Sequence, residues 1–485
     1  MNRYRNVLFV AMLFSVAPML SVAADNTATT NALGKKSHNA SINSTEIIAI
    51  NSHGLDRTFS TAGFIDFNNA FFKKFGVNDR ACASCHVPTE GWTITPTGVK
   101  ERFEETQGLD PLFRLVDGAN SPNADVSTVE KRREAYSMLL NKGNIRVGIG
   151  IPADAEFELA EVDDPYGFAT ANELSLFRRP TPTANLKFIN TVMWDGRETT
   201  LNATSTDCVF GTTTCFSPVS FDLSTQANHA TRGHAEALAD LTEAERAEIL
   251  DFEMGLFNAQ IIDFSAGDLS AGGAKGGPNL LVDQVYYFGI NDTLVGDYRT
   301  RVPFDSNVIG LYSSWLRYAT RAKNFVQKAR GSIARGEILF NSKPIQIVGV
   351  AGINDDLNVD VLPGTCTTCH NTPNSGNHST PMPLNIGIAD ASRRTPDMPL
   401  YTLRNKVTNE TVQTTDPGRA LLTGKWKDIG RFKGPVLRSL ASRPPYFHDG
   451  SANDLEAVVN FYNQRFSMGL TDREKADLAA FLASL

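Results

Sequence analysis

The chain has 485 residues, of which 41% are hydrophobic and 20% are charged, and its formal net charge is −7. This composition is typical of soluble globular proteins, and the length exceeds what one hydrophobic core usually supports, so we expect two or three domains. The negative charge leaves no basic footprint, and we therefore expect no nucleic acid partner.

The first 23 residues have the pattern of an export signal. Arg3 and Arg5 precede an apolar run at residues 7–20, and residues 21–23 ("SVA") resemble a cleavage site. The run is shorter than the ~20 residues that a membrane span needs, and no later run reaches that length. We expect a periplasmic or secreted protein with no stable membrane span; an uncleaved signal anchor is the alternative. Residues 24–46 are expected to form a flexible tether.

Helical patterns dominate the chain from Ile47 onward. Residues 64–75 ("FIDFNNAFFKKF") and 333–340 ("IARGEILF") carry apolar side chains at helical spacing. Residues 311–330 are predicted to form a long amphipathic helix, after a glycine-rich connection at residues 265–278. Near the C-terminus, Thr471 and Glu474 form a capping-box pattern that predicts a final helix.

Two Cys-x-x-Cys-His motifs carry the chemistry of the chain, "CASCH" at residues 82–86 and "CTTCH" at residues 366–370. Zinc is one alternative, but the pairs are much further apart than the ~15–20 residues of a zinc ribbon. A dithiol redox site is another, and neither explains the histidine. Covalent haem explains it, because two thiols on one turn bind the vinyl groups and the imidazole binds the iron. We predict two haem c groups. The attachment residues are Cys82, Cys85, His86, Cys366, Cys369 and His370.

The remaining cysteines, Cys208 and Cys215, are expected to form a disulfide in an oxidising compartment. Two free buried thiols are the alternative.

A weak repeat follows the two motifs, at residues 181–201 ("TPTANLKFINTVMWDGRETTL") and 432–455 ("FKGPVLRSLASRPPYFHDGSANDL"). It predicts two related units. We therefore expect a mainly α protein with two cytochrome c-like haem domains, at residues 47–325 and 326–485, with long loops and few short strands.

The two motifs, the run "MWDGRETTL" at residues 193–201 and the run at residues 431–463 resemble bacterial dihaem cytochrome c peroxidases and their relative MauG. The resemblance covers the chain from about residue 60 onward. It implies that the N-terminal haem reacts with peroxide, that the C-terminal haem relays electrons, and that Trp194 lies between them. A core tryptophan without a role in electron transfer is the alternative for Trp194.

The resemblance also implies a distal ligand of the C-terminal haem at Tyr462, where the peroxidases have Met and MauG has Tyr. A phenolate ligand favours high-valent chemistry over electron intake. Simple packing on the inner face of a helix at residues 455–463 is the alternative.

For the base at the peroxide-reacting haem, the resemblance implies Glu236, ten residues after Gln226, or the nearby His234. A surface position is the alternative for His234, and His229 is a weaker candidate. An insertion containing Cys208 makes this alignment loose.

Arg197 and Arg438 are predicted to bind haem propionates, although surface arginines need no such role. The resemblance further implies a calcium ion between the domains. Arg179 and Arg443 stand where related proteins have Asn and Thr, and arginine repels a cation, so calcium is disfavoured unless other oxygens bind it.

Together these features predict a periplasmic dihaem c-type peroxidase that reduces hydrogen peroxide with electrons from a small cytochrome c or cupredoxin. One alternative is a MauG-like high-valent oxidase or oxygenase that acts on a protein or another organic substrate. The other is a dihaem electron-transfer cytochrome without catalytic activity.

Overall fold

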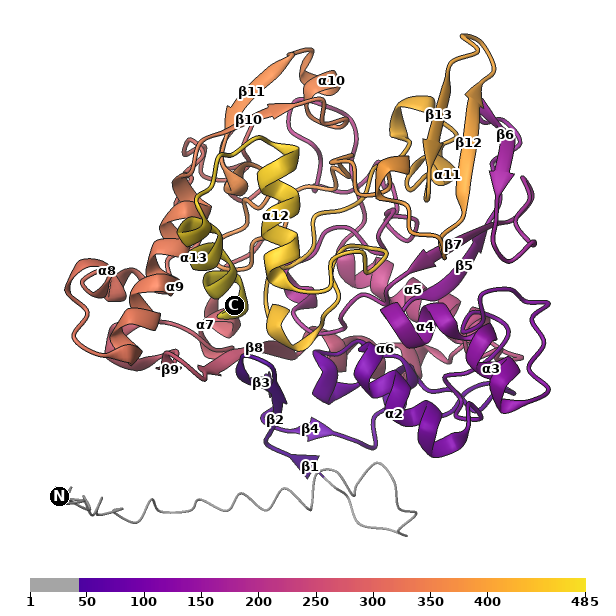
Figure 1. Ribbon diagram of the computed structural model, residues 1–485, viewed down its shortest axis with the longest axis horizontal. Coiled ribbons are helices and arrows are strands. Elements are labelled where there is room, and N and C mark those ends of the chain that lie inside the picture. Colours follow the sequence, from indigo (N-terminus) through magenta and orange to yellow (C-terminus); the bar gives the residue numbers. More distant parts are fainter. Residues whose placement is uncertain (1–42) are drawn as a thin grey trace, which may run out of the picture. The chain divides into compact units, whose positions relative to one another are not determined.

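Helices and antiparallel strands share the fold of residues 43–485, the part of the chain that this computed structural model describes (Figure 1). Helices make up 31% of it and strands 18%. The prediction of a mainly α fold with few strands is therefore wrong, and the elements do not show cytochrome c-like domains. The expected signal peptide and residues 24–42 of the expected tether lie outside the described residues.

The largest sheet has four antiparallel strands in the order β2-β3-β8-β9. Its strands are β2 (Glu46–Asn51), β3 (Gly54–Ser60), β8 (Leu256–Asp263) and β9 (Gly267–Asp268). In β3 every second residue is buried, as expected for a strand. The inward positions are Asp56, Thr58 and Ser60, so polar side chains occupy the places where apolar ones would reveal a strand. This inverted pattern explains why the sheet was missed.

The other strands form small antiparallel sheets. A three-stranded sheet has the order β13-β12-β6, and β1, β5 and β10 pair with β4, β7 and β11. The strands are β1 (Asn43–Ser44), β4 (Ile65–Asp66), β5 (Ile145–Ile149), β6 (Phe157–Asp163), β7 (Leu174–Arg178), β10 (Ile345–Val348), β11 (Val361–Gly364), β12 (Leu400–Asn405) and β13 (Thr411–Thr414). Because β6 pairs with β12, segments more than 200 residues apart lie side by side.

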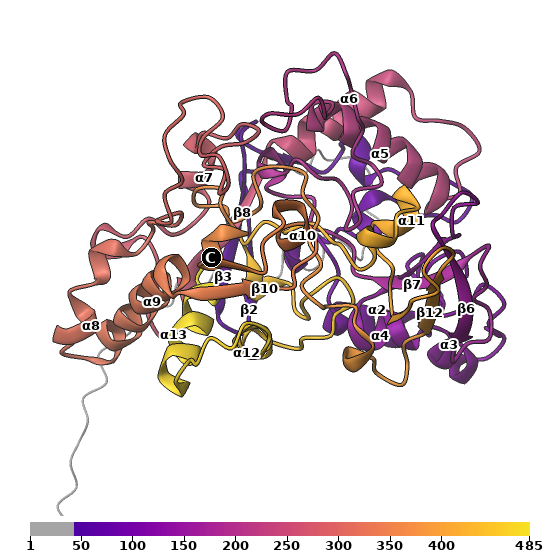
Figure 2. The same cartoon turned by 90° about the horizontal axis from the view of Figure 1, so that it is seen from above.

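The α-helices are mostly short and lie around these sheets (Figures 1 and 2). They are α2 (Pro96–Thr106), α3 (Val129–Ala135), α4 (Ser137–Lys142), α5 (Val219–Gly233), α6 (Glu243–Met254), α7 (Asn279–Asp283), α8 (Tyr318–Arg321), α9 (Phe325–Ser342), α10 (Asn354–Leu357), α11 (Ala420–Thr423), α12 (Leu455–Arg465) and α13 (Asp472–Ala483).

Helices with clear start signals were predicted well. Thr471 accepts a hydrogen bond from Glu474 N at the start of α13, which confirms the capping box. Residues 333–340 lie within α9, as predicted. The long helix at residues 311–330 is wrong, because Asn324 caps a new helix and interrupts it.

The helix predicted at residues 64–75 is also wrong. The segment holds β4 and one 3-10 turn, η1 (Ala70–Phe72). Its phenylalanines pack among other aromatics, and the Phe71 ring lies 5.2 Å from that of Phe252 and 6.0 Å from that of Trp92. Aromatic clustering therefore produced a spacing that resembles helical periodicity.

Helices α9 and α13 pack against each other at very short range (Figure 2). Gly336 of α9 makes this possible, since a Cβ atom there would lie within 3 Å of the carbonyl of Asp477 in α13. Arg335 binds the Asp477 carboxylate at 2.7 Å beside this contact. The largest apolar core lies around these two helices and α12.

Residues 42–485 form one compact unit, and the boundary expected near residue 325 stays a prediction. Among the described residues, no helix is both long enough and apolar enough to cross a membrane.

Candidate functional site

The two Cys-x-x-Cys-His motifs adopt the same local structure. Each begins a 3-10 helix, η2 (Cys82–Ser84) or η7 (Cys366–Thr368). The carbonyl of the first cysteine accepts hydrogen bonds from the backbone N–H groups of the second cysteine and the histidine, at 3.0–3.3 Å in both motifs. This turn is the arrangement that attachment of one flat group through two sulfurs and one imidazole requires.

Both motif histidines are held in the orientation of a metal ligand. His86 Nδ1 lies 3.2 Å from the carbonyl of Trp92, and His370 Nδ1 lies 2.5 Å from that of Gly376. A carbonyl can only accept, so Nδ1 carries the proton and Nε2 keeps its lone pair. Burial lowers the pKa of both imidazoles, that of His86 to about 4, which keeps them neutral.

Each motif lines a large cavity. Cys82, Cys85 and His86 face the first cavity, of about 1630 Å³, and the second motif faces the second cavity, of about 1620 Å³, each volume including the part open to solvent. The second cavity is lined by Cys366, Cys369 and His370 together with mainly apolar side chains. Each motif thus faces a cavity of its own, and the two cavities are of nearly equal size.

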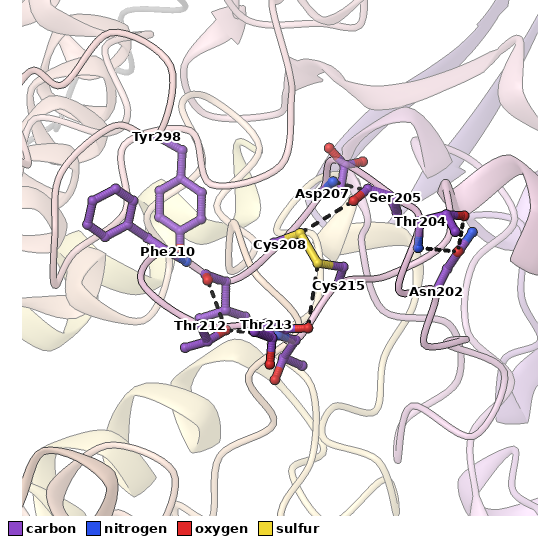
Figure 3. Close-up of a disulfide and its surroundings, with 12 residues drawn as sticks. Asn202, Thr204, Ser205, Asp207, Cys208, Phe210, Thr212, Thr213, Cys215 and Tyr298 are labelled. Atoms are coloured by element: carbon purple, nitrogen blue, oxygen red, sulfur yellow. Dashed lines mark hydrogen bonds between the residues drawn. A yellow bond between two sulfur atoms is a disulfide. The ribbon is translucent and has the colours of Figure 1, made fainter.

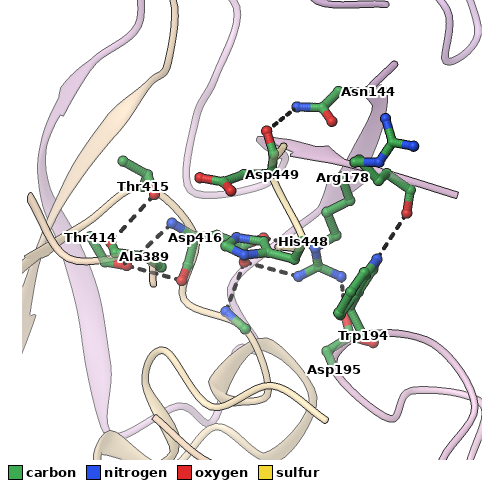
Figure 4. A network of polar contacts seen from close by, with 12 residues as sticks. Asn144, Arg178, Trp194, Asp195, Ala389, Thr414, Thr415, Asp416, His448 and Asp449 are labelled. Atoms are coloured by element: carbon green, nitrogen blue, oxygen red, sulfur yellow. Dashed lines mark hydrogen bonds and ion pairs between the residues drawn. The ribbon is translucent and has the colours of Figure 1, made fainter. Parts of the chain in front are cut away.

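Trp194 lines both cavities, so it belongs to the wall that separates them. Its indole N–H donates to the carbonyl of Arg179 at 2.8 Å, and its ring lies edge-on to His448, 6.4 Å between centroids (Figure 4). His448 in turn stacks on Phe432 at 4.1 Å. The sequence-predicted tryptophan is thus placed between the two motifs.

A buried ion network fixes the loop that carries Trp194. Arg178 of β7 contacts Asp195 at 2.5 Å and Asp416 at 2.7 Å, and all three side chains are almost fully buried (Figure 4). Burial alone would raise the pKa of Asp195, but Arg178 and Arg197 lower it to about 2. Removal of one partner from such a network leaves a buried charge unpaired, which costs ~3–5 kcal/mol.

Four basic side chains around the cavities have no carboxylate partner among the described residues: Arg179, Lys433, Arg438 and Arg443. Arg179, Lys433 and Arg443 line both cavities, and Arg438 lines the first. Burial lowers the pKa of Lys433 to about 8, and that of Arg438 to about 10. Unpaired buried cations are costly, so these groups require anions. The propionates of two haems meet that requirement, and the residues fit the predicted cofactor.

The two arginines predicted as propionate partners both line the first cavity. Arg438 is 2% exposed, donates to the carbonyls of Asn374 and Gly277, and leaves its Nε without a partner. Arg197 lies 3.3 Å from Asp195. The two therefore differ, because Arg438 has no counter-ion and Arg197 already has one.

The surroundings of Arg179 and Arg443 do not fit calcium. The Arg179 guanidinium donates to the carbonyls of Lys142 and Ile94, both at 2.7 Å, and lies 3.5 Å from the carbonyl of Arg443. The oxygens that a divalent cation would need already bind a side-chain cation.

Tyr462 of α12 lines the second cavity together with Cys366, Cys369 and His370. Its hydroxyl makes no hydrogen bond to any described residue, and burial raises its pKa. Its ring stacks on Phe466. Tyr462 therefore packs against a neighbouring ring and also faces the cavity, and its role as an iron ligand stays a prediction.

The structure separates the three candidates for the base. His234 lines the first cavity, and its Nδ1 lies 2.6 Å from Asp117. Glu236 instead bonds the Asn78 side chain at 2.9 Å and is not part of the cavity lining. His229 is exposed and pairs with Glu198 at 2.9 Å. Only His234 of the three faces the motif, and the roles of all three stay predictions.

Sequence reasoning missed Glu253 near the end of α6. This residue lines the first cavity and is 6% exposed. A signal existed, because Glu253 follows the buried Ile249 by four residues and therefore lies on the inner face of the helix. Gln226 of α5 also lines this cavity.

The disulfide between Cys208 and Cys215 is confirmed, with a Cα–Cα distance of 3.9 Å (Figure 3). It closes a loop whose tip carries Phe210, and the backbone N–H of Phe210 donates to the Tyr298 hydroxyl at 3.0 Å. None of these four residues lines either cavity.

Known proteins similar to this chain are peroxidases. Cytochrome-c peroxidase IdrP2 of Denitromonas iodatirespirans is 32% identical over 132 residues, 25% of this chain and 36% of that protein. Cytochrome-c peroxidase IdrP1 of Pseudomonas sp. (strain SCT) is 28% identical over 213 residues, 40% of this chain and 46% of that protein. The chain thus spans less than half the length of these relatives. The matches confirm the resemblance to cytochrome c peroxidases.

A MauG-like protein associated with microbial copper homeostasis is 16% identical, with a TM-score of 0.36 over 86% of each chain. That score is too low to relate the two folds. No protein-family model matches the chain.

Proposed function

We propose that this chain is a dihaem c-type peroxidase that reduces hydrogen peroxide at the first cavity and receives electrons through the second. The observation that carries the proposal is that the two cavities share one wall. Two motifs of identical turn geometry face two cavities of nearly equal size, and Trp194 lines both. Similarity to cytochrome c peroxidases supports the reaction class.

In this proposal the chain holds each haem by two thioethers and one imidazole. His86 and His370 present Nε2 to the cavities because backbone carbonyls bind their Nδ1 atoms. Haem iron, when bound, supplies the electron exchange that peroxide reduction needs. Arg438, Lys433, Arg179 and Arg443 neutralise the propionates, and Trp194 shortens the electron path between the cavities.

His234 is the proposed base for the first peroxide proton. The buried Asp117 carboxylate can only accept, so His234 Nδ1 donates to it and Nε2 remains free to accept a proton. Burial alone would raise the pKa of Asp117, but Arg80 and His234 lower it and keep it charged. This orientation of a histidine by a buried aspartate is one that catalytic bases commonly use.

We place the protein in the periplasm or outside the cell. The Cys208–Cys215 disulfide supports an oxidising compartment, and the N-terminal pattern supports export. The electron donor would be a small redox protein such as a cytochrome c or a cupredoxin.

A second candidate function rests on Tyr462. A hydroxyl that faces the second motif and has no protein partner is available as an iron ligand. An anionic phenolate ligand would lower the reduction potential and favour oxidation of a protein or another organic substrate, as in MauG.

Mass spectrometry and a turnover assay test the proposal. Peptides that contain Cys82 and Cys366 are each expected to carry one added porphyrin mass, and the holoprotein to consume peroxide with a reduced small redox protein. Peroxide consumption without donor turnover would favour the MauG-like candidate. A holoprotein inert to peroxide would leave the electron-transfer cytochrome, and peptides without porphyrin would overturn all three.

A further inference from the structure

Glu253 is a buried acid with no partner, and it faces the first cavity. It lines this cavity at the end of α6, is 6% exposed, and its carboxyl group makes no hydrogen bond or ion pair with any residue in 43–485. Buried carboxyl groups are normally hydrogen-bonded or paired, because an unpartnered one is costly. A costly side chain of this kind in a reaction cavity is a candidate functional group.

The surroundings keep this group neutral. Burial raises the pKa of Glu253 to about 8, and no cationic side chain contributes to the shift. The charge of ionised Glu253 in turn raises the pKa of the Cys82 thiol. The other titratable or charged groups of the cavity lining are Arg80, Cys85, His86, Arg178, Arg179, Arg197, His234, Lys433, Arg438 and Arg443. At neutral pH Glu253 is therefore a proton donor within the cavity.

We propose that Glu253 is a catalytic proton donor of the first cavity. The inference rests on the proposed peroxidase function and deepens it. Reduction of one H₂O₂ to two waters breaks the O–O bond and consumes two electrons and two protons. The electrons come from the redox partner protein. Glu253 gives one proton to the leaving oxygen, which departs as water, and Glu253 is then reprotonated from solvent. The second oxygen takes the two electrons, the proton that His234 removed from the peroxide and one further proton from solvent, and it leaves as the second water.

This role complements that of His234. His234 is held by Asp117 at Nδ1 and has Nε2 free to accept the proton of the attacking peroxide, whereas the carboxylic acid of Glu253 donates a proton. A base and an acid in one cavity thus divide the two proton transfers between them. Glu236 does not line this cavity, and its carboxylate accepts a hydrogen bond from the Asn78 side chain.

The test compares Glu253→Gln with a matched control, Asp251→Asn, in the holoprotein. Asp251 lies on the same helix but is exposed, so both variants remove one carboxylate from α6. Glu253→Gln is expected to lower the rate constant of single-turnover peroxide consumption by about 10²-fold or more. Glu253→Asp is expected to recover part of it, and Asp251→Asn to match wild type.

Fluoride binding to the ferric holoprotein gives a readout independent of turnover. Deprotonated Glu253 repels the anion, so wild-type affinity is expected to fall between pH ~6 and ~9 by about tenfold more than in Glu253→Gln. If Glu253→Gln and Asp251→Asn behave alike in both assays, or if Glu236→Gln reproduces the losses instead, the inference is overturned. If the wild-type holoprotein does not consume peroxide, the proposed peroxidase function is refuted. The pH dependence of fluoride binding still tests the protonation of Glu253 in that case.

Discussion

The two cavities share their attachment geometry and differ in the side chains that face the attached group. The first contains a histidine oriented by a carboxylate and a neutral acid, His234 and Glu253. The second is lined mainly by apolar side chains, and Tyr462 of α12 faces it. Peroxide reduction consumes protons, whereas electron transfer does not. In the proposed function, the first cavity therefore performs the peroxide chemistry and the second transfers electrons.

The largest expected effect comes from removal of one motif histidine. His86→Ala removes the ligand in the cavity with proton-handling groups, and peroxide consumption is expected to fall by about 10³-fold, ~4 kcal/mol of barrier. His370→Ala is expected to spare the first peroxide turnover and abolish steady-state turnover with the donor. Stopped-flow measurements separate the two. Equal loss of the first turnover in both variants would contradict the assignment of roles.

Trp194→Phe tests whether the wall shared by the two cavities carries electron transfer between them. Phenylalanine is harder to oxidise than tryptophan and also loses the N–H bond to the Arg179 carbonyl. Electron transfer between the cavities is expected to slow at least about tenfold. Trp426→Phe is the control, because Trp426 belongs to another core and lines neither cavity. Similar rates in both variants would mean that electrons pass by another path.

The free energy of unfolding is expected to depend on pH because of Glu253 in the first cavity. The pKa of Glu253 is raised from 4.5 to about 8, so between these values the unfolded chain is ionised while the folded one is neutral. Unfolding then releases a proton, and its free energy falls as pH rises, by up to about 1.4 kcal/mol per pH unit.

Chemical denaturation of the wild type and Glu253→Gln at several pH values measures this slope. The wild-type curve is expected to fall relative to that of the variant from pH ~4.5 to ~8 and to run parallel above it. Asp251→Asn is expected to keep the wild-type slope. A slope that survives in Glu253→Gln would assign the proton to another group.

The smallest effect on stability is expected in the second cavity. Tyr462→Phe removes a hydroxyl that has no hydrogen bond to a described residue, so the free energy of unfolding is expected to change by less than ~1 kcal/mol. The absorption spectrum of the C-terminal haem is nevertheless expected to shift. Tyr446→Phe is the control, because Tyr446 lines the same cavity but its hydroxyl already donates to the Leu440 carbonyl. An unchanged spectrum in Tyr462→Phe would exclude ligation.

Local signals in the sequence carried most of the successful predictions. The cysteine motifs, the capping box at Thr471 and the Cys208–Cys215 pair depend on neighbouring residues, and each is present as expected. Strand β3 was missed because its inward residues are polar and find partners far along the chain, such as Ser439 for Asp56. That pairing is a tertiary property that periodicity does not encode.

The same distinction explains the candidate site. The resemblance predicted Trp194 and Tyr462, which line the cavities, and it left Glu236 and His234 as alternatives for the base. His234 lines the first cavity, whereas the Glu236 carboxylate bonds Asn78. Glu253 acquires its position and its raised pKa only when α6 packs against the first cavity. A single sequence contains the inner-face spacing of this residue but not the desolvation that makes it chemically distinct.

The backbone carbonyls of Lys142 and Ile94 hold the Arg179 guanidinium at the wall that the two cavities share. The positive charge of this wall therefore comes from a side chain and not from a bound metal ion. A guanidinium is covalently part of the polypeptide, so it cannot leave its site as a bound metal ion can. Dialysis and chelating agents therefore cannot strip it, and metal scarcity in the surroundings leaves this part of the protein unaffected.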